Sequence, residues 1–394
     1  MSSRLLKILI FIALATGGFA IGTTEFATMS LLPLIQHTFT ISEATASHMV
    51  SMYALGVVIG APIITVLGAR IPRKPLLIAL MAVFALANGL SAVAPSYTWL
   101  LVFRFISGLP HGAYFGVAAL VAASIVNPNQ RTQAVGYILL GLTFATIAGV
   151  PLVTWLASLV GWRAGYWMVT TLAIAAGLLI LAVAPHQPVD EQAHPLRELT
   201  ALARPNVWLT LSIGAIGLGG AFAVYTYLTT ILDDITHMST ALVPMVLAAF
   251  GVGMTLGNII VPYFADRWQM PTAAVMLTLI AVSMLGFPLA SHNSVAIFIV
   301  IFCIGFGTAL ETILQARLMD VAGDAQNLAA ALNHVAFNLA NALGPFLAGI
   351  AIASGFGVEV AAGYVGAGLA LLGLVMWGCT VCFDRQTGHV PNAA

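Results

Sequence analysis

The chain has 394 residues, of which 60% are hydrophobic and only 7% are charged. An ordinary soluble domain carries roughly 25% charged residues, so 13 basic and 13 acidic side chains are too few to cover a water-exposed surface. The composition excludes a water-soluble globule and predicts a protein embedded in a lipid bilayer. The net charge of zero gives no indication of a nucleic-acid partner.

Helices rather than strands are expected to cross the membrane. A spanning helix needs about 20 apolar residues, whereas barrel strands alternate apolar and polar residues. The run from Leu172 to Ala184 is apolar on every side. Proline, asparagine, glycine and charged residues divide the chain into twelve apolar segments, near 7–34, 47–68, 75–95, 98–125, 132–159, 164–184, 207–232, 242–264, 272–290, 294–316, 327–353 and 361–383. We therefore predict an all-α membrane protein with twelve transmembrane helices.

A long polar stretch, from Pro185 to Asn206, separates the sixth segment from the seventh. We predict an N-terminal six-helix half over 1–185, a cytoplasmic linker over 186–206 and a C-terminal six-helix half over 207–394. An internal repeat supports this division, because three glycines recur at an offset of 197: Gly56, Gly60 and Gly108 as Gly253, Gly257 and Gly305. Two parallel six-helix repeats are the organisation of one large class of transporters.

Basic residues indicate the orientation, because Lys and Arg in short loops favour the cytoplasmic side. Only Arg163 lies in the loops opposite the termini. The loops on the side of the termini carry Arg4, Lys7, Arg70, Arg73, Lys74, Arg131, Arg197, Arg204, Arg267, Arg317 and Arg385. We therefore expect both termini to be cytoplasmic.

Several short motifs together resemble the major facilitator superfamily over essentially the whole chain. They are Gly22-Thr-Thr-Glu25-Phe26, the stretch from Tyr53 to Pro62, Arg104-Phe-Ile-Ser-Gly-Leu-Pro-His-Gly112, Gly149-Val-Pro151, Gly161-Trp-Arg163 and the stretch from Asn333 to Pro345. Within the superfamily the chain is most similar to bacterial twelve-span drug–proton antiporters, especially the sugar-efflux and arabinose-efflux-like members. The resemblance implies a transporter of the bacterial inner membrane, with small-molecule substrates and protons as partners. We expect a monomer.

Two departures from the family pattern bear on function. The family's loop between spans two and three usually has an acid where this chain has Ala69, although Arg70 and Arg73 are present. The acid instead occurs in the second half, as Asp266 followed by Arg267. We predict a conformational latch formed by these two arginines with Asp266 and Arg267. The antiporter signature around Gly149 also lacks its final glycine pair, so antiport is supported less strongly than transport.

Charged groups within spanning segments are costly, so each is a functional candidate. Glu25 in the first segment is the predicted proton carrier, and the resemblance adds that an acid in this span is a coupling position. Arg104 and His111 lie two helical turns apart on one face of the fourth segment. Arg104 is expected to pair with Glu25 when that acid is ionised, and His111 can itself titrate. The alternatives are a structural acid, a permanent ion pair and a hydrogen-bonded core histidine.

Aromatic and polar side chains are the predicted substrate-binding residues. The aromatic candidates combine large apolar area with a polar group where they are tyrosines. The polar candidates His334, Asn338 and Asn341 form a stripe on one face of the eleventh segment. The full set is Tyr53, Tyr114, Phe115, Phe222, Tyr225, His334, Asn338 and Asn341. The alternatives are packing or interfacial anchoring for the aromatic residues, and helix-to-helix hydrogen bonding for the stripe.

The sequence favours proton-coupled efflux of small organic solutes such as drugs or sugars by alternating access. Proton-linked uptake or facilitated diffusion of a sugar or nucleoside is the alternative. The chain lacks a phosphate-binding loop and a His-Glu-x-x-His motif, so we expect no ATP use, no metal, no cofactor and no enzymatic activity. A sensor built on a transporter fold is a further alternative.

Overall fold

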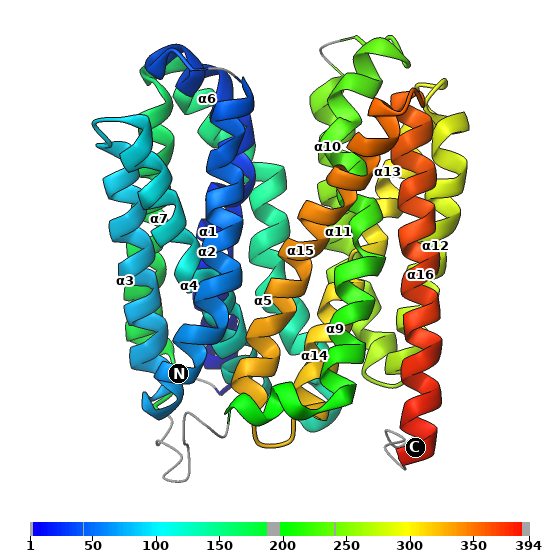
Figure 1. The fold of residues 1–394 in the computed structure, drawn as a ribbon. Helices are drawn as coiled ribbons and strands as arrows, with labels where there is room; N and C mark the ends of the chain where they lie inside the picture. Colours follow the sequence, from blue (N-terminus) through cyan, green and yellow to red (C-terminus); the bar gives the residue numbers. More distant parts are fainter. Residues whose placement is uncertain (1–2, 42, 187–197, 240–241, 388–394) are drawn as a thin grey trace. The chain divides into compact units, whose positions relative to one another are not determined.

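The computed structural model describes all residues except 1–2, 42, 187–197, 240–241 and 388–394, and the described residues form helices joined by short connections (Figure 1). Twelve stretches of these residues are helical, long and apolar enough to cross a membrane. Each lies at one of the twelve predicted segments, and the all-α class is confirmed. The first stretch is Leu5–Leu32 and the last is Val358–Thr387.

The first six spans include one interrupted helix. The elements are α1 (Ser3–Phe39), α2 (Glu43–Leu67), α3 (Arg73–Ala92), α4 (Tyr97–Ser124), α5 (Arg131–Phe144), η3 (Ala145–Gly149), α6 (Val150–Val160) and α7 (Trp162–Val183). The fifth span therefore consists of α5 and α6 joined by the π-helical turn η3. Such turns are rare and frequently occur at functional sites.

The last six spans include two interrupted helices. The short 3-10 helix η4 (Leu199–Ala203) precedes them, and they comprise α9 (Pro205–Gly217), α10 (Gly219–Asp234), α11 (Val243–Ala265), α12 (Gln269–Ala290), α13 (Ala296–Gly307), α14 (Leu310–Val321), α15 (Gln326–Ala353) and α16 (Val358–Thr387). The seventh span breaks at Leu218, between α9 and α10, and the tenth breaks between α13 and α14. Where a helix breaks within a span, backbone N–H and C=O groups lose their helical hydrogen bonds and must find other partners.

The chain forms two compact units that interleave along the sequence. Unit 1 comprises Met1–Pro128, Tyr137–Ala201 and Asp324–Val335, and unit 2 comprises Asn129–Gly136, Leu202–Gly323 and Ala336–Ala394. Helix α5 thus begins in unit 2 and ends in unit 1, whereas α15 begins in unit 1 and ends in unit 2. The predicted division into 1–185, 186–206 and 207–394 stays a prediction, and most of its linker lies outside the described residues.

The repeated glycines make the same contacts in both units. In unit 1, a Cβ added at Gly56 would lie 2.2 Å from the carbonyl oxygen of Phe105, and one at Gly108 would lie 2.2 Å from that of Tyr53. In unit 2, a Cβ added at Gly253 or Gly305 would lie 2.3 Å from the carbonyl oxygens of Phe302 and Phe250 respectively. These carbonyl groups are themselves 197 residues apart. Glycine therefore permits the close helix approach of α2 with α4, and of α11 with α13.

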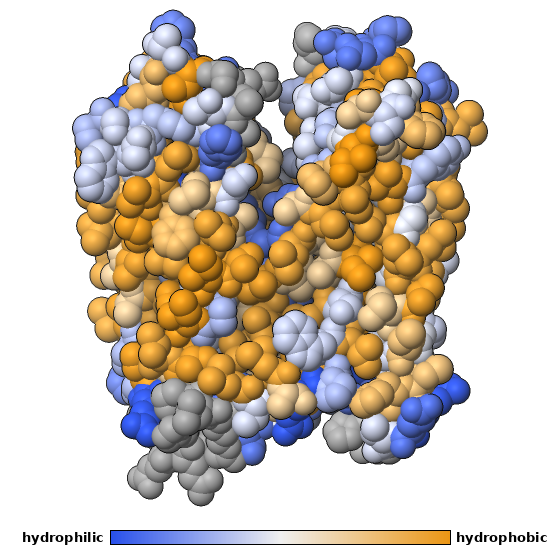
Figure 2. All heavy atoms as spheres, viewed as in Figure 1, coloured by the Kyte–Doolittle hydropathy of each residue, from blue (hydrophilic) through white to orange (hydrophobic). Residues whose placement is uncertain are grey.

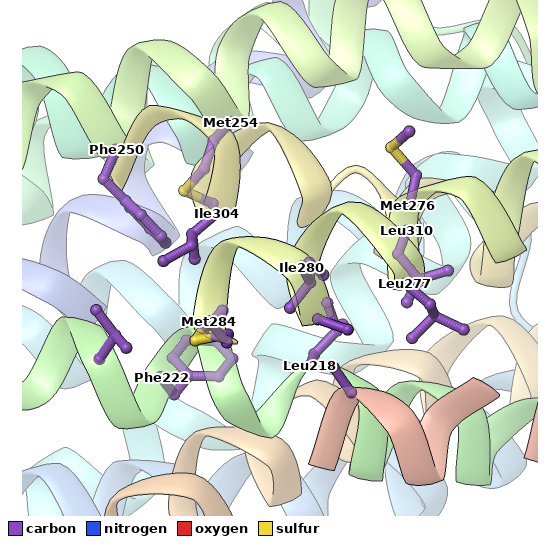
Figure 3. Close-up of a cluster of buried hydrophobic side chains, with 14 of the residues drawn as sticks. Leu218, Phe222, Phe250, Met254, Met276, Leu277, Ile280, Met284, Ile304 and Leu310 are labelled. Carbon is purple, nitrogen blue, oxygen red and sulfur yellow. The ribbon is translucent and has the colours of Figure 1, made fainter. Parts of the chain in front are cut away.

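Each unit presents apolar side chains outward over its middle. Figure 2 shows hydrophobic residues gathered there and hydrophilic residues toward the two ends of each unit. Ile174 within α7 and Val282 within α12 are 52% and 61% exposed, which suits a side chain whose solvent is lipid. Inside unit 2, a second set of apolar side chains forms the core between α10, α11, α12 and α13, including Phe222, Phe250 and Met284 (Figure 3).

Candidate functional site

Glu25 lies on α1 in the interior of unit 1. Its side chain is buried, with 4% of the residue exposed, and neither carboxylate oxygen has a hydrogen-bond partner within the described part of the chain. Close packing holds this part of α1 in place, because a Cβ added at Gly149 of η3 would lie 2.2 Å from the Thr23 hydroxyl oxygen. The π-helical turn therefore packs against the stretch of α1 that contains Glu25.

Arg104 lies on α4 in unit 1 and is buried, with 1% of the residue exposed. Its Nη1 donates a hydrogen bond to the Thr24 hydroxyl oxygen at 3.0 Å, and its guanidinium carbon lies 4.5 Å from the centroid of the Tyr53 ring. It forms no ion pair with Glu25 among the described residues. The structure thus shows the separated arrangement of the two groups, with the guanidinium held by a neutral hydroxyl group and an aromatic face.

Tyr53 connects Arg104 to His111. The Tyr53 hydroxyl group and His111 Nδ1 share a hydrogen bond of 3.0 Å, while the opposite nitrogen, Nε2, has no partner among the described residues. The His111 ring lies 5.3 Å from Phe115 and 5.4 Å from His334, between ring centroids. Phe115 in turn stacks on His334 at 4.4 Å. Five predicted site residues therefore form one buried column in unit 1: Arg104, Tyr53, His111, Phe115 and His334.

Tyr114 has a different environment. Its hydroxyl group donates to the Leu14 carbonyl oxygen at 2.7 Å, and its ring end occupies the space where Gly17 has no side chain. Tyr114 therefore ties α4 to the backbone of α1. Its predicted role in substrate binding stays a prediction.

The other predicted binding residues lie in unit 2. Phe222 packs edge-on against Phe337 at 4.8 Å, and Tyr225 lies 4.7 Å from Phe250, between ring centroids. Asn338 is buried and Asn341 is partly exposed on α15. The predicted stripe of His334, Asn338 and Asn341 is on one continuous helix, but His334 belongs to unit 1 and the two asparagines to unit 2.

Asp266, one of the predicted latch residues, binds the beginning of α5. Its carboxylate accepts hydrogen bonds from the backbone N–H groups of Thr132 at 2.7 Å and Gln133 at 3.2 Å. Burial raises the pKa of the Asp266 carboxyl group above its usual value, and these hydrogen bonds act in the opposite direction. An acid at a helix N-terminus satisfies otherwise unpaired N–H groups. Asp266 therefore caps a helix that continues into unit 1.

The remaining latch residues are found in both units. The Arg267 guanidinium lies over the Trp268 ring at 4.8 Å. In unit 1, Arg70 lies in the short 3-10 helix η1 (Gly68–Arg70) and Arg73 is the first residue of α3.

The beginning of α15 is also capped by an acid, which is Glu198. Ala69, where the family usually has an acid, has no carboxylate that could do this. Glu198 accepts hydrogen bonds from the Leu328 backbone N–H at 3.0 Å and from the Asn327 side-chain amide at 2.5 Å.

Sequence reasoning missed two polar clusters. Thr24 and Asn88 hydrogen-bond beside Arg104, and the signal for Asn88 is a lone amide within the otherwise apolar third segment. Arg317, counted among the loop cations, lies instead inside α14, where it is 1% exposed and pairs with Asp384 at 2.5 Å. The hydropathy pattern misplaced Arg317 because it lies close to the end of its span. Arg197 lies outside the described residues.

Comparison with known proteins agrees with the fold and the motifs. The sequence pattern of the Major Facilitator Superfamily matches residues 14–345. The Escherichia coli "Inner membrane transport protein YdhP" is 39% identical over 92% of this chain and 94% of its own length. The "Chloramphenicol resistance protein" of Streptomyces lividans is 29% identical over 86% and 87% of the two chains. The "Probable sugar efflux transporter" of Haemophilus influenzae is 27% identical over 96% of both.

A solved structure shares the fold. The crystal structure of the human organic anion transporter MFSD10 superposes with a TM-score of 0.77, at 14% identity, over 96% of this chain and 100% of that one. Because that identity is low, the likeness supports the architecture alone. The family match over most of the chain and the similarity to YdhP identify the protein: it belongs to the Major Facilitator Superfamily and is a multi-pass membrane transporter rather than an enzyme.

Proposed function

We propose that the chain is a secondary active exporter that moves small organic solutes outward in exchange for protons. The observation that carries this proposal is the carboxyl group of Glu25, which is buried and has no hydrogen-bond partner among the described residues. Burying an ionised carboxylate is far more costly than burying a neutral acid unless the charge is paired. The arrangement favours the protonated acid, and Arg104 lies on a neighbouring helix to pair with the carboxylate after the proton leaves.

The proton gradient supplies enough free energy for this work. One elementary charge that crosses 100 mV is worth about 2.3 kcal/mol, which corresponds to roughly a fiftyfold gradient of a neutral solute exchanged for one proton. In this scheme Glu25 exchanges the proton and Arg104 stabilises the ionised form of Glu25. His111 is a further member of the buried column that contains Arg104. The two six-helix repeats alternate access to the bound solute.

The substrate class is proposed from the aromatic side chains and the relatives. Phe222 and Tyr225 in unit 2, with Tyr53 and Phe115 in unit 1, offer apolar faces and hydroxyl groups that suit amphipathic organic molecules. His334, Asn338 and Asn341 add hydrogen-bonding groups on α15. Relatives named for chloramphenicol resistance and for sugar efflux support drugs or sugars as cargo.

The remaining expectations complete the proposal. The chain acts as a monomer in the bacterial inner membrane with both termini in the cytoplasm. Asp266 and Arg267, with Arg70 and Arg73, form the latch, and the capping of α5 by Asp266 supports this role because it holds the first turn of a helix that continues into the other unit.

The test uses purified full-length protein in proteoliposomes with an imposed pH gradient and labelled chloramphenicol or a labelled monosaccharide. We expect solute to move against the proton flux, and Glu25→Gln to reduce pH-driven movement to the level of protein-free vesicles. Glu25→Asp keeps an acid and should retain part of the activity. Glu359→Gln, at the first turn of α16, is the matched control and should transport normally.

Two outcomes would contradict the proposal. Undiminished pH-driven transport by Glu25→Gln would reject Glu25 as the proton carrier. Movement of the solute with the protons would favour the alternative of proton-linked uptake, and movement that an uncoupler does not affect would favour facilitated diffusion of a sugar or nucleoside.

A further inference from the structure

We infer that Thr24 and Asn88 are positioning residues for Arg104. Together they hold its guanidinium group away from the adjacent carboxyl group of Glu25, so that Glu25 can keep its proton until the transport cycle releases the cation. This inference deepens the proposed function and rests on Glu25 as the group that exchanges protons.

A directed set of hydrogen bonds fixes the cation. Asn88 Nδ2 donates to the Phe84 carbonyl oxygen one turn earlier on α3, at 2.8 Å. This bond turns the amide so that its oxygen faces α1, where it accepts the Thr24 hydroxyl proton at 2.9 Å. A hydroxyl group has one proton and two lone pairs. Because Asn88 takes that proton, the Thr24 oxygen presents a lone pair to Arg104, and the 3.0 Å bond from Nη1 results.

The location of Thr24 makes this arrangement consequential. Thr24 directly precedes Glu25 on α1, so the residue that retains the cation is the chain neighbour of the acid that the cation would otherwise neutralise. All members of the set are buried, and a charge-assisted hydrogen bond in such surroundings is stronger than one in water. Without the hydroxyl group, the guanidinium has a stronger acceptor in the Glu25 carboxylate than in any remaining neutral group.

Few other charged or titratable groups reach this region of α1. Helices α2, α4, α5 and α7 pack against α1, as do η3 and α6. The last two carry no titratable side chain. From the other four, Tyr137 of α5 packs edge-on against Phe11 at 5.2 Å between ring centroids, and Tyr114 of α4 donates to the Leu14 carbonyl oxygen. Arg163 of α7 donates to the Ala94 carbonyl oxygen, and His48 lies at the beginning of the α2 span. The groups beside Arg104 are Tyr53 and His111, which bind each other, and Tyr166, whose ring lies 5.8 Å from the guanidinium carbon.

The test measures protonation of Glu25 without any transported solute. Dicyclohexylcarbodiimide adds to a protonated carboxyl group and not to a carboxylate, so adduct formation at Glu25, located by peptide mass spectrometry, reports its protonated fraction. Full-length protein in liposomes is labelled between pH 5 and pH 10, and Glu25→Gln removes the adduct. In Thr24→Val and Asn88→Ala, the midpoint of labelling should fall by about one to three pH units, because an opposite charge within about 4–6 Å favours the ionised acid.

Matched variants separate positioning from a general disturbance of α1. Thr24→Ser keeps the hydroxyl group and should keep the wild-type midpoint. Thr28→Val removes a buried hydroxyl group of the same helix that donates to the Thr24 carbonyl oxygen, and it should also leave the midpoint unchanged. In an Arg104→Gln background, Thr24→Val should have no effect, because the cation that it releases is gone.

An unchanged or raised midpoint in Thr24→Val would overturn the inference, and so would an equal fall in Thr28→Val. The failure of the proposed function is a separate result. If the midpoints move as expected but Glu25→Gln retains full pH-driven transport, the positioning of Arg104 stands and proton carriage by Glu25 is wrong.

Discussion

Glycine at position 108 determines how closely Tyr53 can approach Arg104. A Cβ at this position would lie 2.2 Å from the Tyr53 carbonyl oxygen and 3.1 Å from the Gly56 Cα atom. Both obstructing atoms are backbone, so α2 and α4 must separate to accept a side chain. The same glycine that permits packing therefore also sets the distance between the aromatic ring and the cation.

We accordingly expect Gly108→Ala to lower the free energy of unfolding by about 1–3 kcal/mol or more, the range for overpacked interiors. Gly305→Ala should behave alike in unit 2, because its Cβ would lie 2.3 Å from the Phe250 carbonyl oxygen. The measurement is thermal unfolding in detergent, followed by tryptophan fluorescence.

Gly286→Ala is the control, since outside the adjoining backbone of α12 no atom of the described residues lies within 4 Å of a Cβ at that position. Equal unfolding temperatures for the Gly108 and Gly286 variants would contradict the packing argument.

The sequence was informative about which residues are chemically unusual and uninformative about their partners. Glu25, Arg104 and His111 could be singled out because charged and titratable groups are rare in apolar segments. That Arg104 binds Thr24 rather than Glu25 could not be predicted, because the choice depends on the orientation of the Asn88 amide on a third helix. Threonine and asparagine are common residues, and only their hydrogen bonds in the structure show that Thr24 and Asn88 hold Arg104.

At the scale of elements, a buried ion pair joins two helices of unit 2. Arg317 on α14 and Asp384 on α16 lie 2.5 Å apart, with side-chain exposures of 1% and 6%. Thr210 and Asn206 on α9 extend the cluster through hydrogen bonds to Arg317 and Asp384 respectively. Three helices therefore meet at one set of polar groups near the ends of their spans.

Removing one member of this pair leaves a buried charge without its partner. We expect Asp384→Asn to destabilise the protein by about 3–5 kcal/mol. The double variant Arg317→Met/Asp384→Leu should recover most of that loss, since neither charge remains. Thermal unfolding in detergent at fixed protein and lipid concentrations checks both expectations.

Asp320→Asn provides the comparison. Asp320 pairs with Arg131 at 3.1 Å, but the two side chains are 43% and 38% exposed, and such pairs contribute about 0–1 kcal/mol. A loss in Asp320→Asn as large as that in Asp384→Asn would show that burial is not the cause.

The spans themselves were predictable because hydrocarbon demands about 20 apolar residues for each crossing. The breaks between α9 and α10 and between α13 and α14 were not, since their residues remain apolar and glycine-containing like the rest of the span. The first turn of α5 also belongs to unit 2, and the first turn of α15 belongs to unit 1. Asp266 and Glu198 hold those turns by backbone hydrogen bonds, which no hydropathy pattern records.

At the scale of the whole molecule, the distribution of Arg and Lys predicts the orientation. Even with Arg317 removed from the count, the loops on the side of the termini carry nearly all of the loop cations, including Arg70 and Arg267. Such loops stay cytoplasmic. Green fluorescent protein fused to either terminus should therefore fluoresce in intact bacteria, and alkaline phosphatase fused after Asp234 should be active.

Phosphatase activity at the C-terminus, together with a non-fluorescent fusion there, would reverse the orientation. Expression of each fusion is checked by immunoblot, so that a missing signal is not mistaken for the wrong side. The fold class and the number of spans do not depend on this result.

The matching glycine contacts in the two units have an evolutionary consequence. The offset that aligns those contacts places Phe250, Ile301 and Thr308 at the positions of Tyr53, Arg104 and His111. A duplicated ancestral half would explain this pattern. Both copies would have kept the glycine contacts between their helices while other side chains changed. At these three positions the N-terminal half carries a tyrosine, an arginine and a histidine, whereas the C-terminal half carries a phenylalanine, an isoleucine and a threonine, so the halves share a packing frame but differ in chemistry there.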